Sequence, residues 1–212
     1  MDWQTWMAFF AASWVIAISP GSGAVLSMSH GLSYGVRGAA MTIAGLELGL
    51  LFILLVAGAG VGSLLVASEL AFNLVKVLGA CYLIYLGWSQ WRAGTAGTLG
   101  GDLQAAPMSA RRRLLTGALT NATNPKGILF MVAVLPQFMS DTRPLWQQLL
   151  VMALTLIVVD LIVMNGYAAG ASALRRLMQN ASAMRAQNRV FGALLMAVGA
   201  GLFFVKRGGQ GA

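Results

Sequence analysis

Ser19-Pro20-Gly21-Ser22 and Asn124-Pro125-Lys126-Gly127 interrupt two long apolar segments of a 212-residue chain. Proline has no N–H group, so the proline of the first stretch leaves the carbonyl of Ile16 without its helical hydrogen bond, and the proline of the second does the same to Asn121. Unpaired backbone groups are tolerated at membrane depth only where they are packed inside protein or face a wet cavity. Both stretches are therefore expected to lie at a site inside the protein and not against lipid.

Each interrupted segment is followed by an apolar segment with one acidic residue deep inside it, Glu47 in the first half and Asp160 in the second. An ionisable side chain at membrane depth is costly and marks a substrate or ion path. Interrupted segments at corresponding places in two halves are typical of secondary transporters, which bind their substrate near the bilayer midplane. The sequence therefore predicts a small secondary transporter.

The composition is that of a polytopic membrane protein. Hydrophobic residues make up 58% of the chain and charged residues 9%, with a mean hydropathy of +0.75, whereas a soluble domain has about 25% charged residues. The net charge of +8 does not indicate a nucleic-acid partner, because the arginines gather between apolar runs, where they orient the chain and meet anionic lipid headgroups. The single cysteine, Cys81, excludes an internal disulfide and is expected to be a small packing residue.

Six apolar runs are long enough to cross a bilayer as helices. They cover residues 4–29, 39–66, 70–91, 114–139, 145–171 and 190–206. The predicted fold is all-α, with residues 1–91 as one three-helix repeat, 92–113 as a cytoplasmic linker and 114–212 as a second repeat. Because three is an odd number of spans, the second repeat is expected to be inverted relative to the first.

Positive residues favour one side of the membrane. Most arginines fall in the gaps after the first, third and fifth runs, which predicts that these gaps are cytoplasmic and both termini are outside. The gaps 30–38 and 172–189 are expected to be loops, with His30 solvated at the start of the first. The N-terminal run lacks the positive stretch of a secretory signal and is expected to stay as a helix.

Glycines recur at four-residue spacing in the second and fifth predicted spans. The pairs are Gly45/Gly49, Gly58/Gly62 and Gly166/Gly170. Such pairs let membrane helices approach closely. Static packing is favoured over a sliding contact as the reason for them.

Polar and glycine residues beside the two prolines predict discontinuous helices, with a proline kink without function as the alternative. The ends of half-helices would offer N–H groups to a carboxylate and free carbonyls to an ammonium group, and an amino-acid zwitterion needs both. The candidate substrate-binding residues at the breaks are Pro20, Gly21, Ser22, Asn124, Pro125 and Lys126, with Asn121 as a further candidate.

Lys126 lies about 18 Å into its predicted span, too deep to reach the interface comfortably. A lysine at that depth needs an anion, and the candidates are Asp160, Glu47 and a substrate carboxylate. A Lys126–Asp160 pair across the site is the expected geometry, so Asp160 joins the candidate substrate-binding residues. A purely structural ion pair is the alternative.

Glu47 points away from the Gly45/Gly49 pair at about 100° per residue and therefore faces another part of the bundle or a cavity. Glu47 and Asp160 are the candidates for proton coupling, since desolvation suits a carboxyl group to carrying a proton. A protonated Glu47 that only holds helices together is the alternative. Lys76, near the start of its span, either extends to the outer interface or belongs to the site.

Three separated motifs resemble the LysE/RhtB family of amino-acid exporters. They are Ser19-Pro20-Gly21, the run from Lys76 to Gly87, and Asn124-Pro125-Lys126-Gly127 with Leu135-Pro136-Gln137-Phe138. Asp160 followed by Tyr167 is similar to the family's fifth-helix pattern. Ser22 departs from the family's usual Pro-Gly-Pro, which should soften the first break.

The resemblance implies a multi-pass exporter of the cytoplasmic (inner) membrane that moves amino acids or close derivatives in exchange for protons. Members of the family differ in substrate, which includes basic amino acids, threonine, homoserine and leucine. The resemblance supports site roles for Pro20, Gly21, Lys76, Asn124, Pro125, Lys126 and Asp160, with Tyr167 as a further candidate.

The hypothesis from sequence is an exporter whose partners are an amino acid, protons and the lipid bilayer, either alone or as a homo-oligomer. The substrate carboxylate would meet Lys126 or half-helix N–H groups, and its ammonium group Asp160 or freed carbonyls. No residue pair suits catalysis, and no cofactor is expected. The alternatives are a channel and an exporter of divalent metal ions or other small solutes, although one His, one Cys and two dispersed acids are a poor metal-ligand set.

Overall fold

The computed structural model describes residues 1–67, 69–92, 105, 107–140, 143–171, 173 and 180–203. All regular secondary structure in this part of the chain is helical, as predicted. The elements are α1 (Trp3–Ile18), α2 (Ser22–Ala67), α3 (Glu69–Arg92), α4 (Ala110–Ala122), α5 (Pro125–Val134), the 3₁₀-helix η2 (Leu135–Phe138), α6 (Leu145–Ala169) and α8 (Ala181–Leu202).

Both proline stretches separate two helices, as the sequence predicts. The first lies between the end of α1 at Ile18 and the start of α2 at Ser22, and the second between α4 and α5. Pro125 occupies the first position of α5, where its missing N–H leaves no helical bond unmade. Asn124 caps the same helix, since its side-chain oxygen accepts a hydrogen bond from the Lys126 N–H at 3.1 Å.

Helix α2 consists of two arms that fold back on each other at Gly35. This glycine has φ 69° and ψ 171°, a left-handed conformation that other residues rarely adopt. His30 Nδ1 and Thr42 Oγ1 are hydrogen-bonded to each other, although twelve residues of straight helix would hold them about 18 Å apart. The expected loop at 30–38 is therefore wrong, because one glycine is enough to reverse the chain.

The position of His30 also differs from the prediction. Its side chain is only 1% exposed and lies edge-on against Tyr34, with ring centroids 5.1 Å apart. Because the first arm of α2 stays helical to the bend, His30 is carried onto a packed face and not into a solvated loop.

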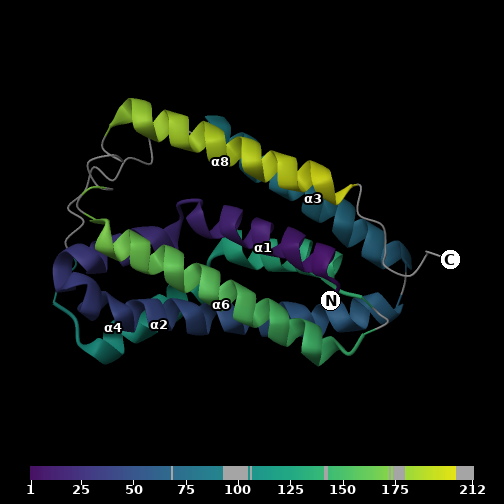
Figure 1. Cartoon of the computed structure of the whole chain (residues 1–212), viewed down its shortest axis with the longest axis horizontal. Coiled ribbons are helices and arrows are strands. Elements are labelled where there is room, and N and C mark those ends of the chain that lie inside the picture. Colours follow the sequence, from purple (N-terminus) through teal and green to yellow (C-terminus); the bar gives the residue numbers. More distant parts are fainter. Residues whose placement is uncertain are drawn as a thin grey trace.

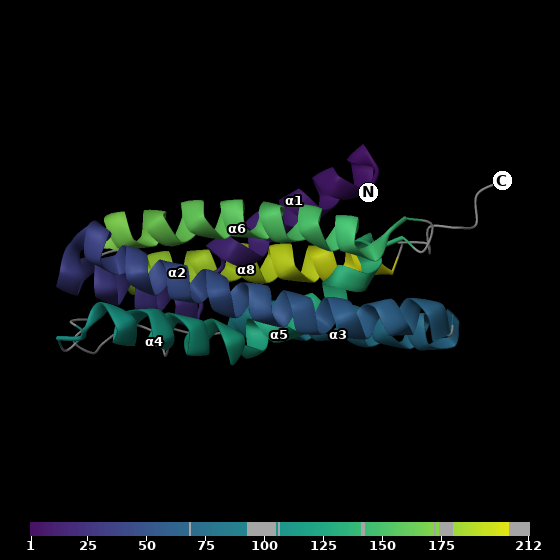
Figure 2. The same ribbon diagram turned by 90° about the horizontal axis from the view of Figure 1, so that it is seen from below.

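Helices α2 and α4 lie in backbone contact along the lower edge of the bundle in Figure 2. A Cβ atom added at Gly45 would overlap the carbonyl of Leu114, and one at Gly49 would overlap that of Ala118. The Gly45/Gly49 pair thus allows the close approach that the sequence predicts. The prediction is wrong for Gly166, because a Cβ atom added there would have no atom of another element within 4 Å.

Helices α3 and α8 form a second closely packed pair, seen in the upper part of Figure 1. Gly87 and Gly192 let the two backbones meet, since a Cβ on either would lie 2.5 Å from the other's carbonyl oxygen. The predicted loop at 172–189 is too long at its C-terminal end, because helix α8 already begins at Ala181. Arg185 therefore lies on this helix and not in a loop. Cys81 is exposed on α3 and is not the packing residue expected.

Two helices in the described part of the chain are long and apolar enough to cross a membrane by themselves. They are α2 over Ser22–Gly60 and α6 over Leu145–Ala169, while α1 and the Pro125–Phe138 segment are apolar but shorter. The predicted set of six spans therefore remains a prediction. It is not established by helix length and composition.

The outer face of α6 is continuously apolar. Leu150, Leu154, Val158 and Ile162 repeat every four residues and are each 51–56% exposed. Exposing an apolar stripe of this length to water is unfavourable, whereas contact with lipid chains is favourable. The other faces of α6 pack against the bundle and carry Asp160 inward.

We expect Gly45→Ala to lower the melting temperature of the solubilised protein by about 2–10 °C, because an extra methyl group in a packed contact costs about 1–3 kcal/mol. The readout is thermal unfolding followed by tryptophan fluorescence. Gly166→Ala is the matched control and should melt at the wild-type temperature or slightly above, since nothing opposes the better helix propensity of alanine. Equal melting of the two variants would contradict the close α2–α4 contact.

Candidate functional site

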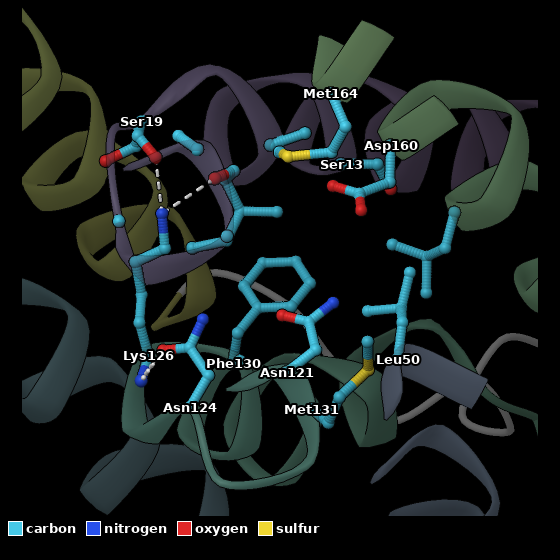
Figure 3. A pocket seen from close by; sticks show the side chains of 17 residues that line it. Ser13, Ser19, Leu50, Asn121, Asn124, Lys126, Phe130, Met131, Asp160 and Met164 are labelled. Carbon is cyan, nitrogen blue, oxygen red and sulfur yellow. Dashed lines mark hydrogen bonds between the residues drawn. The ribbon is translucent and has the colours of Figure 1, made fainter. Parts of the chain in front are cut away.

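The two helix breaks meet through the side chain of Lys126. Its ammonium nitrogen donates hydrogen bonds to the carbonyl of Ile16 at 3.1 Å and to that of Ser19 at 2.5 Å (Figure 3). The Ile16 carbonyl is the one that Pro20 deprives of its helical partner. A residue of the second break thus satisfies the backbone group freed by the first.

A third carbonyl at the end of α1 is satisfied from α6. The Tyr167 hydroxyl donates to the carbonyl of Ile18 at 2.6 Å. The break is also tied to α3, because the Ser19 hydroxyl donates to the Gln90 side-chain oxygen at 3.3 Å. Side chains from three other helices therefore hold the C-terminal end of α1 in place.

The second break is satisfied locally. The Asn121 carbonyl, which Pro125 was expected to leave free, accepts a hydrogen bond from the Asn124 N–H at 3.1 Å. The Asn121 side chain donates to the carbonyl of Leu46 at 2.8 Å and so joins α4 to α2. The two breaks are thus unlike: the first presents carbonyls to the protein interior, and the second supplies a cation.

A cavity of about 60 Å³, measured as the space open to the centres of water molecules, lies where these elements meet. It has room for several waters or part of a small solute. Five predicted site residues line it: Gly21, Asn121, Asn124, Lys126 and Asp160. The rest of its wall is mainly apolar, with Phe130, Met131 and Met164 among the larger side chains (Figure 3).

Lys126 and Asp160 lie on different sides of this cavity (Figure 3). The ammonium group of Lys126 is turned to the carbonyls at the end of α1, and the two charged groups do not form the expected ion pair. The backbone carbonyls replace the carboxylate as partner of the lysine. Asp160 is left facing the cavity from α6.

Glu47 is buried behind Asp160. Its side chain is 7% exposed, and neither carboxyl oxygen has a hydrogen-bond partner of normal geometry. It is near enough to Asp160 for the two carboxyl groups to interact electrostatically. Glu47 therefore faces away from the α2–α4 contact, as predicted, but does not line the cavity itself.

The family model of the LysE type translocators matches residues 14–205 of the chain. The chain belongs to this family. The resemblance inferred from the three motifs is confirmed, and the protein is a membrane translocator and not an enzyme.

Relatives match this LysE type translocator over nearly its whole length. A homoserine/homoserine lactone efflux protein of Salmonella typhi is 43% identical over 202 residues, which cover 94% of the chain and 96% of the relative. A membrane protein of Vibrio cholerae described as uncharacterized is 41% identical with the same coverage. A leucine efflux protein of Klebsiella pneumoniae is 31% identical over 76% of each chain. No solved structure matches the translocator significantly.

Several residues expected at the site act through the backbone or lie outside it. Pro20, Ser22 and Pro125 shape the breaks but do not line the cavity. Tyr167 reaches the site only through the Ile18 carbonyl. Lys76 belongs to α3 by its backbone, but its side chain lies outside the described part of the chain.

Sequence reasoning missed Ser13, which is fully buried in the cavity wall and donates to the Phe9 carbonyl at 2.7 Å. Its position seven residues before Pro20 puts it on the same face of the first helix, and this spacing could have revealed it. It also missed Gln137, which is 7% exposed and has no partner for either amide atom among the described residues. Gln137 lies inside a motif that the sequence had singled out.

We expect Tyr167→Phe to destabilise the translocator by about 1–3 kcal/mol, because the buried carbonyl of Ile18 loses its donor. Thermal unfolding in detergent measures the effect. Tyr85→Phe is the control, since Tyr85 is 63% exposed on α3. If both variants lost the same stability, the Tyr167 hydroxyl would not be holding the end of α1.

Proposed function

We propose that this translocator exports small amino acids and close derivatives, homoserine and homoserine lactone first among them, across the cytoplasmic membrane. The observation that carries the proposal is the cavity between the two helix breaks, with an ammonium group on one side and a carboxyl group on another. The efflux names of the Salmonella and Klebsiella relatives support export of this class of solute. The higher identity and fuller coverage of the homoserine-type relative favour that substrate over leucine.

The proposed architecture is a six-span inverted repeat, with residues 1–91 and 114–212 as the repeats. The presence of one helix break near the start of each half supports it. Under this arrangement the cavity lies at the interface of the repeats, and rocking of one repeat against the other would open it to either side. Substrate would enter from the cytoplasm.

In the proposed binding mode, the α-carboxylate meets the Lys126 ammonium group, and the α-ammonium meets Asp160 or the carbonyls at the end of α1. Lys126 has three N–H donors and uses two on backbone carbonyls, so one remains for a substrate oxygen. Asn121 and Asn124 add amide groups to the same wall. The apolar side chains opposite them would accept a short aliphatic side chain.

Proton coupling is proposed to run through Asp160 and Glu47. Two carboxylates held close together in a dry interior repel each other, and a proton on one removes the repulsion. A substrate ammonium group at Asp160 would also compensate that charge. Substrate and proton would thus alternate at the same carboxyl pair, as exchange of an outbound amine for an inbound proton requires.

In proteoliposomes, Asp160→Asn should reduce homoserine counterflow by at least about tenfold, because a charged hydrogen-bond partner of the ammonium group is lost. Asp2→Asn is the matched control, because Asp2 only caps α1 and asparagine caps helices equally well. Counterflow of homoserine, leucine and arginine by the wild-type protein sets the substrate range. Failure of all three to exchange would refute the proposed function.

Glu47→Gln should separate transport from coupling. Glu47 does not line the cavity, so homoserine exchange is expected to continue, while accumulation driven by an imposed pH gradient is lost. The two measurements are made on the same vesicles with and without the gradient. Gradient-driven accumulation at the wild-type level would remove Glu47 from the coupling scheme.

A further inference from the structure

The C-terminal end of α1 binds a cation through backbone carbonyls alone. The carbonyls of Ile16 and Ser19 converge on one ammonium group, and Pro20 is the reason that the first of them is free. The C-terminal end of a helix carries partial negative charge from its aligned peptide dipoles, which adds to the attraction for a cation. Ile16 and Ser19 both line the cavity.

The cation bound there comes from the other half of the chain. Lys126 is 110 residues from Ile16 in sequence, and its hydrogen bonds join the break of the first half to that of the second. Gly21 leaves room for the lysine, since a Cβ at that position would be 3.3 Å from the ammonium nitrogen. The contact is therefore a tie between the two halves across the proposed site.

A primary ammonium group on a substrate has the same chemistry as the Lys126 side chain. Homoserine and its lactone both have this group, whereas only homoserine has a free carboxylate. Both can present an amine to the cavity that holds the two carbonyls and Asp160. A ligand shifts a conformational equilibrium only if it binds one state better than another, and a substrate that takes the place of Lys126 in the tie would bind the open state better.

We propose that the substrate's ammonium group replaces that of Lys126 on the carbonyls of Ile16 and Ser19, which releases the tie between the two halves. The freed lysine then turns to the oxygen atoms at C1 of the substrate, a carboxylate in homoserine and an ester carbonyl in the lactone. Lys126 is thus a tethered competitor for the amine subsite, and the backbone end of α1 is the group that recognises the amine. This inference rests on the proposed function and goes beyond it by naming the subsite and the event that unlocks it.

The test compares the binding of homoserine lactone to the full-length protein in lipid nanodiscs before and after removal of the competitor. Lys126→Gln removes the cation, so the lactone should bind at least about tenfold more tightly than to the wild type, since two hydrogen bonds from the lysine no longer have to be broken and only one, to the ester carbonyl, is lost. γ-Butyrolactone, which lacks the amine, should bind to neither protein. Unchanged or weaker lactone binding by a Lys126→Gln protein with wild-type melting behaviour would overturn the proposal.

A second variant tests the carbonyls with Lys126 in place. Pro20→Ala restores an N–H group that can donate to the Ile16 carbonyl and thereby occupies part of the subsite. Binding of homoserine and of its lactone should then weaken together, by about tenfold. Pro144→Ala, at the start of α6 and outside the cavity lining, is the matched control. Unaltered affinities in Pro20→Ala would overturn the proposal even if Lys126→Gln failed to fold.

The wild-type protein separates this proposal from the proposed function. If it exchanged neither homoserine nor its lactone, the proposed function itself would fail. Suppose instead that the wild-type protein exchanged both substrates, but Lys126→Gln and Pro20→Ala bound the lactone with wild-type affinity. Only the proposed replacement of Lys126 by the substrate's ammonium group would then be refuted.

Discussion

The arrangement of side chains around the end of α1 depends on the N–H group that Pro20 lacks. Pro20 cannot complete the hydrogen bond to the Ile16 carbonyl, and a carbonyl inside the protein without a partner is costly. The bond is supplied by Lys126 from a segment that begins more than a hundred residues later in the chain. Tyr167 and Gln90 fasten the neighbouring positions, so the local defect recruits side chains from α3, α5 and α6 to one point.

This arrangement also accounts for a lysine inside the helix bundle. Burying an ammonium group without a partner is prohibitive, and the usual remedy is a carboxylate. Here two backbone carbonyls serve instead, and Asp160 on α6 is left free to face the cavity. Lys126 and Asp160 therefore line one small cavity without a direct ion pair between them, and a solute with a carboxylate and an ammonium group could interact with both.

Close helix packing holds the cavity in shape. Glycines at the α2–α4 and α3–α8 contacts bring backbones together, while the first arm of α2, before the bend at Gly35, supplies Gly23 and Ala24 to the cavity wall. The outer face of α6 remains apolar and exposed, which places the membrane on that side and the polar groups on the inside. The same helix thus separates lipid from the site.

The order of residues was enough to predict the two breaks, the freed Ile16 carbonyl, the inward position of Glu47 and Asp160, and the close packing at Gly45. Each follows from local chemistry: a proline without a donor, a glycine without a side chain, or an acid within an apolar run. The folded arrangement was needed to find that Lys126 binds the end of α1 and not Asp160, that His30 is buried, and that Glu47 stands behind Asp160. Those outcomes depend on which groups meet through space after the chain reverses at Gly35 and the halves pack together, and residue spacing along the chain carries no information on such distances.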